Sequence, residues 1–259
     1  MKIAVSGKGG VGKSTIAAAL ALTLSARGER VLALDADPDA NLAAALGMQE
    51  AARRNITPVS RQIALIEERT GAKINSYGKV FKLNPEVSDV AERFATRWNG
   101  VDMLVLGAVG KGGSGCACPM SAFIKALVTD VVLYKNETLI MDMEAGVEHL
   151  GRATSHGVDC MLVVVEPGAR AVDCALSVTR MCREIGIKNI VYVGNKAASQ
   201  DDVDYMASAL GAPLAAVFPY SSAVRDADRR NASAIDAADK KFLDELNKLL
   251  AFLENKYRG

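Results

Sequence analysis

A glycine-rich segment near the start of the chain constrains the fold more than any other feature of the sequence. Residues 7–14 read GKGGVGKS and match the pattern G-x-x-x-x-G-K-[ST]. The segment lies between an apolar run at 2–6 and a stretch of helical periodicity at 13–27. In that setting the pattern forms a phosphate-binding loop, because glycines let backbone N–H groups approach phosphates and the helix directs its positive end at them. We therefore expect a P-loop nucleotide-binding fold.

Short β-type runs alternate with helical segments along the rest of the chain, which is typical of βαβ units. The strands are expected at Lys2–Ser6, Arg30–Asp35, Asp102–Leu106, Thr138–Asp142, Asp159–Val165, Asn189–Gly194 and Leu214–Phe218, with helices at Lys13–Arg27, Asp39–Leu46, Ser121–Leu133, Ala171–Ile185, Asp201–Ala209 and Ala238–Lys256. Several strands are uninterrupted apolar runs, as expected for strands covered on both faces. The predicted fold class is α/β, with a mostly parallel twisted sheet flanked by helices on both faces.

The domain organisation follows from length and from one irregular region. At 259 residues, an α/β protein can be a single domain, and we predict one P-loop ATPase domain over 1–259. Residues 48–100 are polar and irregular, with one further helix expected at Arg61–Arg69. We interpret 48–100 as an insertion within that domain.

Charge and hydropathy argue against several classes of partner. The net charge of +1 gives no basic excess for nucleic acid or an anionic membrane. Apolar runs fall far short of the roughly 20 residues that cross a bilayer. The expected last helix places its leucines on one face, which favours core packing over a membrane-targeting tail. We expect a cytoplasmic protein without a nucleic-acid or membrane partner, and reduced cysteines.

The loop itself supplies the predicted phosphate contacts. Backbone amides of the loop should cradle the phosphates, Lys13 should contact the β and γ phosphates, and the Ser14 hydroxyl should bind Mg²⁺. The nucleotide-binding residues predicted here are Gly9, Gly10, Val11, Gly12, Lys13, Ser14 and Thr15.

Aspartates follow two of the expected strands, at the sheet edge where ligands bind in open α/β folds. Asp35 and Asp142 are predicted to support Mg²⁺ and its waters, and Asp37 lies at the same edge. We interpret Asp39 as the N-cap of the next helix. Gly146 follows Asp142 in a segment that is typical of switch II, where a glycine amide senses the γ phosphate.

Two later strand ends are predicted to hold the nucleotide base. Asn195 and Lys196 close one strand, and Ala198 stands where a guanine-reading motif needs an acidic residue, so adenine is favoured. Pro219 and Tyr220 follow the next strand and are placed near the base, although Tyr220 could equally be a core residue.

The segment GKGGVGKST, with its extra lysine at position 8, resembles the deviant Walker A motif of the MinD, ParA and nitrogenase iron protein family. The resemblance implies that Lys8 reaches across a homodimer interface to the partner's nucleotide. It also implies that Asp37 is the switch I aspartate, which orients the water that attacks ATP. Lys8, Asp37 and Lys13 are therefore the predicted catalytic residues.

A second motif, Cys116-Ala117-Cys118, could bind a soft metal ion. Two thiolates make only half of a four-coordinate site, and a twofold dimer would supply the other half. The motif alone is equally compatible with incidental cysteines. Cys174 and Cys182 fit one apolar helix face and Cys160 begins a buried strand, so none of these three needs a metal.

Longer segments make the metal interpretation more specific. The runs GGSGCACP at 112–119, DMEAGVEHLGR at 142–152, VVEP at 164–167 and KLNP at 82–85 resemble the CooC/AcsF group of nickel-insertion accessory ATPases. The resemblance implies ATP and ADP at the P-loop, Ni²⁺ at Cys116 and Cys118 with Zn²⁺ as a substitute, and carbon monoxide dehydrogenase or acetyl-CoA synthase as the client. It assigns no role to Glu148 and His149.

Two other functions stay open on the sequence. Four thiolates across a dimer could hold an iron–sulfur cluster, which would make the chain an ATP-gated electron carrier like the nitrogenase iron protein. A positioning ATPase of the ParA or MinD type is less favoured, because it would not need the CxC motif.

Overall fold

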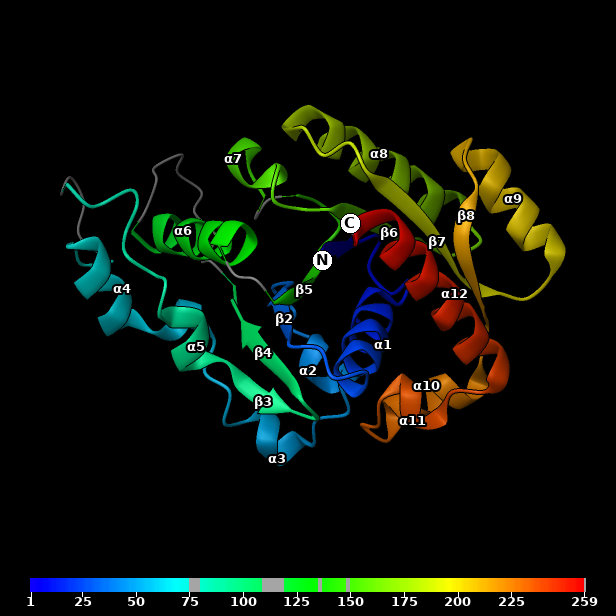
Figure 1. Cartoon of the computed structure of the whole chain (residues 1–259), viewed down its shortest axis with the longest axis horizontal. Helices are drawn as coiled ribbons and strands as arrows, with labels where there is room; N and C mark the ends of the chain where they lie inside the picture. The colour runs from blue at the N-terminus through cyan, green and yellow to red at the C-terminus, as the bar shows by residue number, and fades with distance from the viewer. Residues whose placement is uncertain (75–79, 109–118, 135–136, 148–149, 259) are drawn as a thin grey trace.

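The computed structural model describes residues 1–74, 80–108, 119–134, 137–147 and 150–258 (Figure 1). In these residues an eight-stranded sheet has the order β3-β4-β2-β5-β1-β6-β7-β8. Every pairing is parallel except that of β3 with β4, which is antiparallel at one edge. The strands are β1 (Lys2–Ser6), β2 (Val31–Ala36), β3 (Thr96–Trp98), β4 (Val101–Val105), β5 (Thr138–Met143), β6 (Cys160–Val165), β7 (Ile190–Ala197) and β8 (Leu214–Pro219).

Helices connect these strands and cover both faces of the sheet (Figure 1). They are α1 (Lys13–Ala26), α2 (Leu42–Ala45), α3 (Glu50–Arg53), the 3-10 turn η1 (Val59–Arg61), α4 (Ile63–Thr70), α5 (Val90–Phe94), α6 (Pro119–Tyr134), α7 (Arg152–Ser155), α8 (Ala169–Ile185), α9 (Gln200–Leu210), α10 (Ser222–Arg229), α11 (Ala234–Ala237) and α12 (Lys240–Tyr257). The connection β1–α1–β2 runs toward one edge of the sheet, and the connection β6–α8–β7 runs toward the other. Both crossovers are expected to be right-handed, so α1 and α8 lie on opposite faces of the sheet. The predicted fold class is confirmed.

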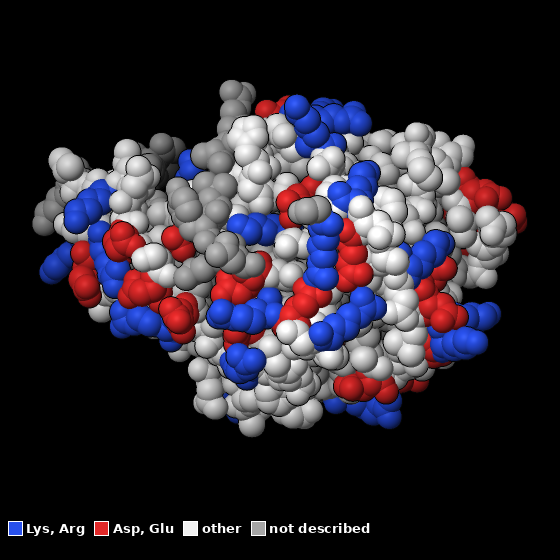
Figure 2. All heavy atoms as spheres, in the orientation of Figure 1, with Lys and Arg blue, Asp and Glu red and all other residues white. Residues whose placement is uncertain are grey.

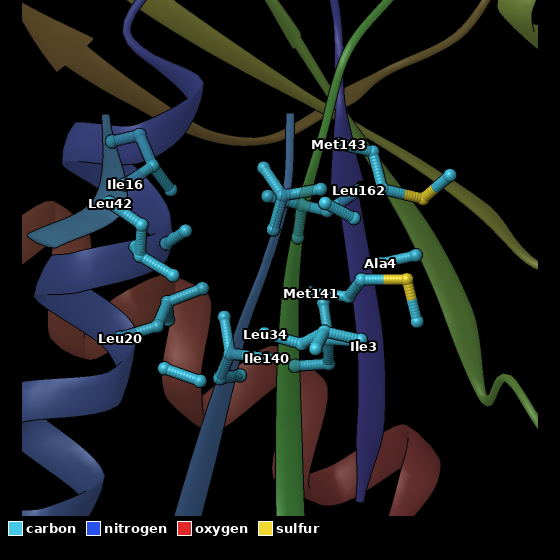
Figure 3. Close-up of a cluster of buried hydrophobic side chains, with 14 of the residues drawn as sticks. Ile3, Ala4, Ile16, Leu20, Leu34, Leu42, Ile140, Met141, Met143 and Leu162 are labelled. Atoms are coloured by element: carbon cyan, nitrogen blue, oxygen red, sulfur yellow. The ribbon is translucent and has the colours of Figure 1, made fainter. Parts of the chain in front are cut away.

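The core lies between the central strands and α1 (Figure 3). Ile3, Leu34 and Ile140 come from the neighbouring strands β1, β2 and β5, and Leu20 of α1 packs toward them. All four are at most 1% exposed. Strands β2, β5 and β6 are buried throughout, in agreement with their largely apolar sequences, which only Asp35 in β2 and Thr138 and Asp142 in β5 interrupt.

The last helix, α12, packs its apolar face into the core. Phe242, Leu246, Leu249, Leu250 and Leu253 are all buried, and the ring of Phe218 of β8 packs against that of Phe242 at a tilt of 51°, with ring centroids 4.8 Å apart. None of the helices in the described residues combines the length and apolar character needed to cross a bilayer. Figure 2 shows basic and acidic side chains intermixed over the face in view.

Part of the segment 48–100 joins the sheet, which the sequence prediction missed. Its last residues form β3, which pairs with β4 from Thr96 opposite Met103 to Trp98 opposite Val101. The three-residue strand is too short for its apolar periodicity to be detected. The indole N–H of Trp98 donates to the carbonyl of Leu46, which joins this edge to the turn after α2.

The prediction that Asp39 caps the second helix was wrong. Helix α2 begins at Leu42 with Asn41 as its N-cap residue. The buried carboxylate of Asp35 accepts the Leu42 amide at 3.0 Å and so takes the role of a capping group. The Asp39 amide instead donates to Asp37 at 3.0 Å, in a turn that precedes the helix.

Candidate functional site

The P-loop joins β1 to α1 at the carboxyl edge of the sheet. Gly7, Gly10 and Gly12 have φ values of 148°, 84° and 98°, in or near the range that glycine alone adopts freely. A side chain at Gly12 would place its Cβ 2.3 Å from the Asn195 amide nitrogen, and one at Gly7 would meet the Val164 carbonyl oxygen at 2.4 Å. Both glycines are therefore required by close packing as well as by backbone conformation.

Lys13 is the first residue of α1 and is 7% exposed. Its Nζ atom lies 3.7 Å from Oδ2 of Asp37, whose side chain is 13% exposed. The segment after β2 thus brings the predicted water-orienting aspartate to the predicted phosphate-binding lysine, over a sequence separation of 24 residues. Lys13 also acts on the neighbouring Asp142 carboxylate, so its ammonium group lies among the aspartates at this edge of the sheet.

Asp35 and Asp142 are direct register partners on β2 and β5, and both are 0% exposed. Burial, and then the neighbouring Asp142 carboxylate, raise the pKa of Asp35 from 3.8 to about 8. Burial also raises the pKa of Asp142 to about 6, against the opposing effects of the Ser14 hydroxyl and Lys13. Two adjacent buried carboxylates resist carrying two charges together unless a cation accompanies them.

Both carboxylate oxygens of Asp142 are buried without a geometrically satisfactory hydrogen-bond partner among the described residues. A buried, unsatisfied carboxylate is costly unless a ligand completes it. Oxygen donors from Asp142, Asp35 and Ser14 match the hard ligands that Mg²⁺ prefers. The residues present therefore fit a magnesium ion that is held through oxygen atoms and waters.

Ser6, the last residue of β1, forms hydrogen bonds with the segment predicted to be switch II. Its hydroxyl donates to the carbonyl of Glu144 at 2.7 Å and lies 3.4 Å from that of Gly146. The Gly146 amide donates to the Glu144 carbonyl at 2.7 Å. The segment directly after β5 is thus tied to the strand that leads into the P-loop.

Asn195 and Lys196 brace the P-loop from β7. The Asn195 amide donates to the Val11 carbonyl at 2.7 Å, and the Lys196 ammonium donates to the Gly10 carbonyl at 2.5 Å. Lys196 has φ 60°, which is uncommon for a residue with a side chain. These contacts assign the pair a second role that the sequence gave no reason to expect, since a sequence motif does not reveal which backbone oxygens lie opposite it.

A cavity of about 520 Å³ extends from the P-loop between β7, β8 and α10. Its lining includes the P-loop residues Gly9 and Gly10, Gly12 to Thr15, Asp37, Asn195, Lys196, Pro219 and Tyr220, so most of the predicted nucleotide-binding residues meet there. Asp35 and Asp142 lie beneath this group at the ends of their strands. The volume falls within the range of small-molecule sites.

Tyr220 lies at the rim of this cavity, half exposed, and does not serve as a core residue. Its hydroxyl accepts a hydrogen bond from Arg225 of α10 at 2.9 Å, and Arg225 also lines the cavity. Arg225 was missed because α10 is a short, strongly polar helix with Ala227 as its buried residue, so it contains no apolar run that marks a helix. Glu166, which directly follows β6, was missed as well; its carboxylate lies 4.0 Å from Lys8 and 3.1 Å from Lys196.

The predicted metal ligands Cys116 and Cys118 lie outside the described residues, as do Glu148 and His149. The other three cysteines carry free thiols: Cys160 and Cys182 are buried, and Cys174 is half-buried. Within the part of the chain that the structure describes, no three His, Cys, Asp or Glu side chains form a metal-binding group. His156 follows α7 as its C-cap residue.

Comparison with known proteins places this site in a family. The family model for the CobQ/CobB/MinD/ParA nucleotide binding domain matches residues 2–234. The chain is 43% identical over 237 residues to the carbon monoxide dehydrogenase accessory protein CooC of Rhodospirillum rubrum, covering 91% of this chain and 90% of that protein. It is 39% identical to an uncharacterized ATP-binding protein of Methanocaldococcus jannaschii, covering 86% and 87%.

Solved structures agree on the fold. A ParA family ATPase from Chlorobium tepidum superposes with a TM-score of 0.69 at 20% identity, covering 96% of this chain and 97% of that one. MinD in the MinC:MinD cell division complex of Aquifex aeolicus gives a TM-score of 0.68 at 19% identity, covering 98% and 96%. The resemblance predicted from the sequence motifs is confirmed by the family model and by the relative at 43% identity, and the solved structures confirm the fold.

Proposed function

The chain belongs to the CobQ/CobB/MinD/ParA nucleotide-binding family, and on that premise we propose that it is an ATPase that inserts nickel into carbon monoxide dehydrogenase or acetyl-CoA synthase. The observation that carries the proposal is the 43% identity to a carbon monoxide dehydrogenase accessory protein over nearly the whole of both chains. The Cys116-Ala117-Cys118 motif adds a pair of soft-metal ligands, and nickel is the cargo rather than a resident cofactor.

In this proposal ATP occupies the cavity with its phosphates in the P-loop. The phosphates bind the ammonium group of Lys13, which then releases its ion pair with Asp37. The freed Asp37 carboxylate orients the attacking water. Ser14, Asp142 and Asp35 hold Mg²⁺, which supplies charge stabilisation for phosphoryl transfer when bound. Pro219, Tyr220, Asn195 and Lys196 surround the base.

Coupling of ATP to the metal rests on dimerisation. The side chain of Lys8 is 40% exposed at the rim of the P-loop, so it is accessible to a second subunit. A twofold axis that brings two P-loop faces together would unite two half-sites of two thiolates each. Hydrolysis would then reset the pair of subunits, and different metal affinities in the two nucleotide states would release nickel to the client.

The test is an anaerobic nickel titration of the purified protein with and without Mg·ATP, followed by absorbance and by sedimentation. The proposal expects one nickel per dimer with near-ultraviolet thiolate charge-transfer bands, and tighter binding when ATP joins the subunits. A stoichiometric iron–sulfur spectrum in the protein as isolated would favour the electron-carrier alternative. Absence of any metal binding under either condition would contradict both.

A further inference from the structure

Glu166 lies between two lysines at the rim of the P-loop. Its Oε1 atom is 4.0 Å from Nζ of Lys8, and its Oε2 atom is 3.1 Å from Nζ of Lys196. The three residues belong to the carboxyl ends of β1, β6 and β7, which are consecutive in the sheet. A single carboxylate whose side chain is 28% exposed thus faces two ammonium groups that are each 40% exposed, and it offsets only part of their combined positive charge.

The two lysines are held to different degrees. Lys196 also donates to the Gly10 carbonyl, and its backbone is fixed at φ 60° at the end of β7. Glu166 is the one carboxylate within 4.0 Å of the Lys8 ammonium among the described residues. Glu166 is therefore anchored through Lys196, whereas Lys8 is attached through a single, longer ion pair.

We propose that Glu166 is a positioning residue that keeps Lys8 on its own subunit before ATP binds and yields it to the partner's nucleotide when two subunits associate. This inference rests on the proposed function, because it takes the cross-subunit role of Lys8 as given. It goes beyond that function by naming the group with which the lysine must break contact.

The energetics suit an exchange of this kind. A half-exposed ion pair at 4.0 Å contributes little to stability and is screened by salt, so a polyphosphate can outcompete it. After Lys8 leaves, Glu166 keeps the closer Lys196 and is not left without a counter-charge. The release therefore costs much less than breaking a buried, isolated pair would.

Zero-length cross-linking with a water-soluble carbodiimide tests the contact directly, since the reagent joins a carboxylate to an adjacent amine as an amide. Peptide mapping of the protein without nucleotide should find Glu166 linked both to Lys196 and to Lys8. A non-hydrolysable ATP analogue with Mg²⁺ should reduce the Lys8 product severalfold and leave the Lys196 product in place. A Lys196 product with no Lys8 product in either condition would overturn the proposal, as would a Lys8 product that persists in a sample shown to be dimeric.

Variants show whether Glu166 acts through Lys8. Glu166→Gln should lower the protein concentration needed for ATP-dependent association by about two- to fivefold, the range expected for one exposed ion pair, and the difference should shrink at high salt. Glu166→Asp retains the charge and should behave like the parent. In a Lys8→Ala background, which is expected not to associate with ATP, Glu166→Gln should leave association absent; association restored by Glu166→Gln there would overturn the proposal.

These measurements separate the two ideas. A parent protein that does not associate with the ATP analogue contradicts the proposed function, and the cross-link without nucleotide then decides the Lys8–Glu166 contact independently. Association that is normal in the parent and unchanged by Glu166→Gln leaves the proposed function standing and refutes the role of Glu166.

Discussion

The ammonium nitrogen of Lys13 lies 3.7 Å from Oδ2 of Asp37, and both side chains are largely buried at the mouth of the P-loop. A residue that is predicted to bind phosphate is thus paired with the residue that is predicted to orient water. We expect phosphate binding to weaken the hold of Lys13 on Asp37, because the charge of one ammonium group would then be shared between the phosphates and the carboxylate. ATP would in this way prepare the carboxylate for hydrolysis only once its phosphates are in place.

Asp37→Asn should separate binding from turnover. The amide keeps the size of the side chain but loses the charge that orients water, so steady-state phosphate release should fall by roughly 10² or more. Nucleotide affinity should be retained or improved, because Lys13 loses its competing carboxylate. Phosphate release and fluorescent-nucleotide titration are the measurements, with Asp39→Asn as the matched control. Unchanged turnover in Asp37→Asn would assign the water to another residue.

Lys8→Ala should remove ATP-dependent dimerisation and most of the turnover while leaving weak nucleotide binding by the monomer. The reason is that Lys13 and the loop amides, which make the contacts within one subunit, are untouched. Size-exclusion chromatography with ATP measures the effect, and Lys248→Ala, at an exposed position on α12, is the control. A Lys8 variant that dimerises like the parent would refute the cross-subunit role.

Gly12→Ala should disrupt the P-loop, whereas Gly9→Ala should leave the fold intact. The added methyl group at position 12 meets the Asn195 amide at 2.3 Å and requires φ 98°, which costs on the order of 1–3 kcal/mol in strain alone. Nothing lies within 4 Å of a Cβ at position 9. Thermal unfolding of the two variants is the comparison. Equal melting temperatures would mean that Asn195 moves aside without cost.

Cys116→Ser and Cys118→Ser should each abolish tight nickel and zinc binding and the associated absorbance, because a hydroxyl is a poor ligand for a soft metal. Basal ATP turnover should persist, since the P-loop is unchanged. Equilibrium dialysis gives the stoichiometry, expected at one metal per dimer, and Cys174→Ser is the control. One nickel per monomer with undiminished affinity in Lys8→Ala would show that the site lies within a single subunit.

Cys160 and Cys182 should resist thiol reagents in the folded protein. Burial raises the pKa of Cys160 to about 12 and that of Cys182 to about 11, and the thiolate is the reactive form. Because the folded state favours the protonated thiol, its contribution to stability is present below pH 9 and is lost as the pH rises from about 9 toward 12. Alkylation and mass spectrometry at pH 8 should leave both unmodified until denaturant is added. Rapid labelling of the native protein would contradict their burial.

Local patterns along the chain were sufficient for much of the fold. The strands in the centre of the sheet are nearly continuous apolar runs. Such runs can be recognised in the sequence, because a strand that is covered on both faces of the sheet needs apolar side chains on both sides. The edge strand β3 and the helix α10 escaped detection, because a three-residue strand is too short to show a period and α10 is a short polar helix with few apolar residues. Asp39 was wrongly predicted as the N-cap of α2, because the carboxylate that accepts the first helical amide, that of Leu42, belongs to Asp35. Asp35 lies seven residues before Leu42, outside the spacing of a local capping motif.

The sequence by itself determined the P-loop, the strand-end aspartates and the family, since each depends on residues that are contiguous or end a strand. Tertiary structure decided which of these groups meet. The pairing of Asp35 with Asp142, of Lys13 with Asp37, and of Glu166 with Lys8 and Lys196 depends on strand order and register. Strand order is set by how all the elements pack together, and an ion pair forms wherever that packing brings two charges within a few ångströms. No local pattern in the chain encodes that distance.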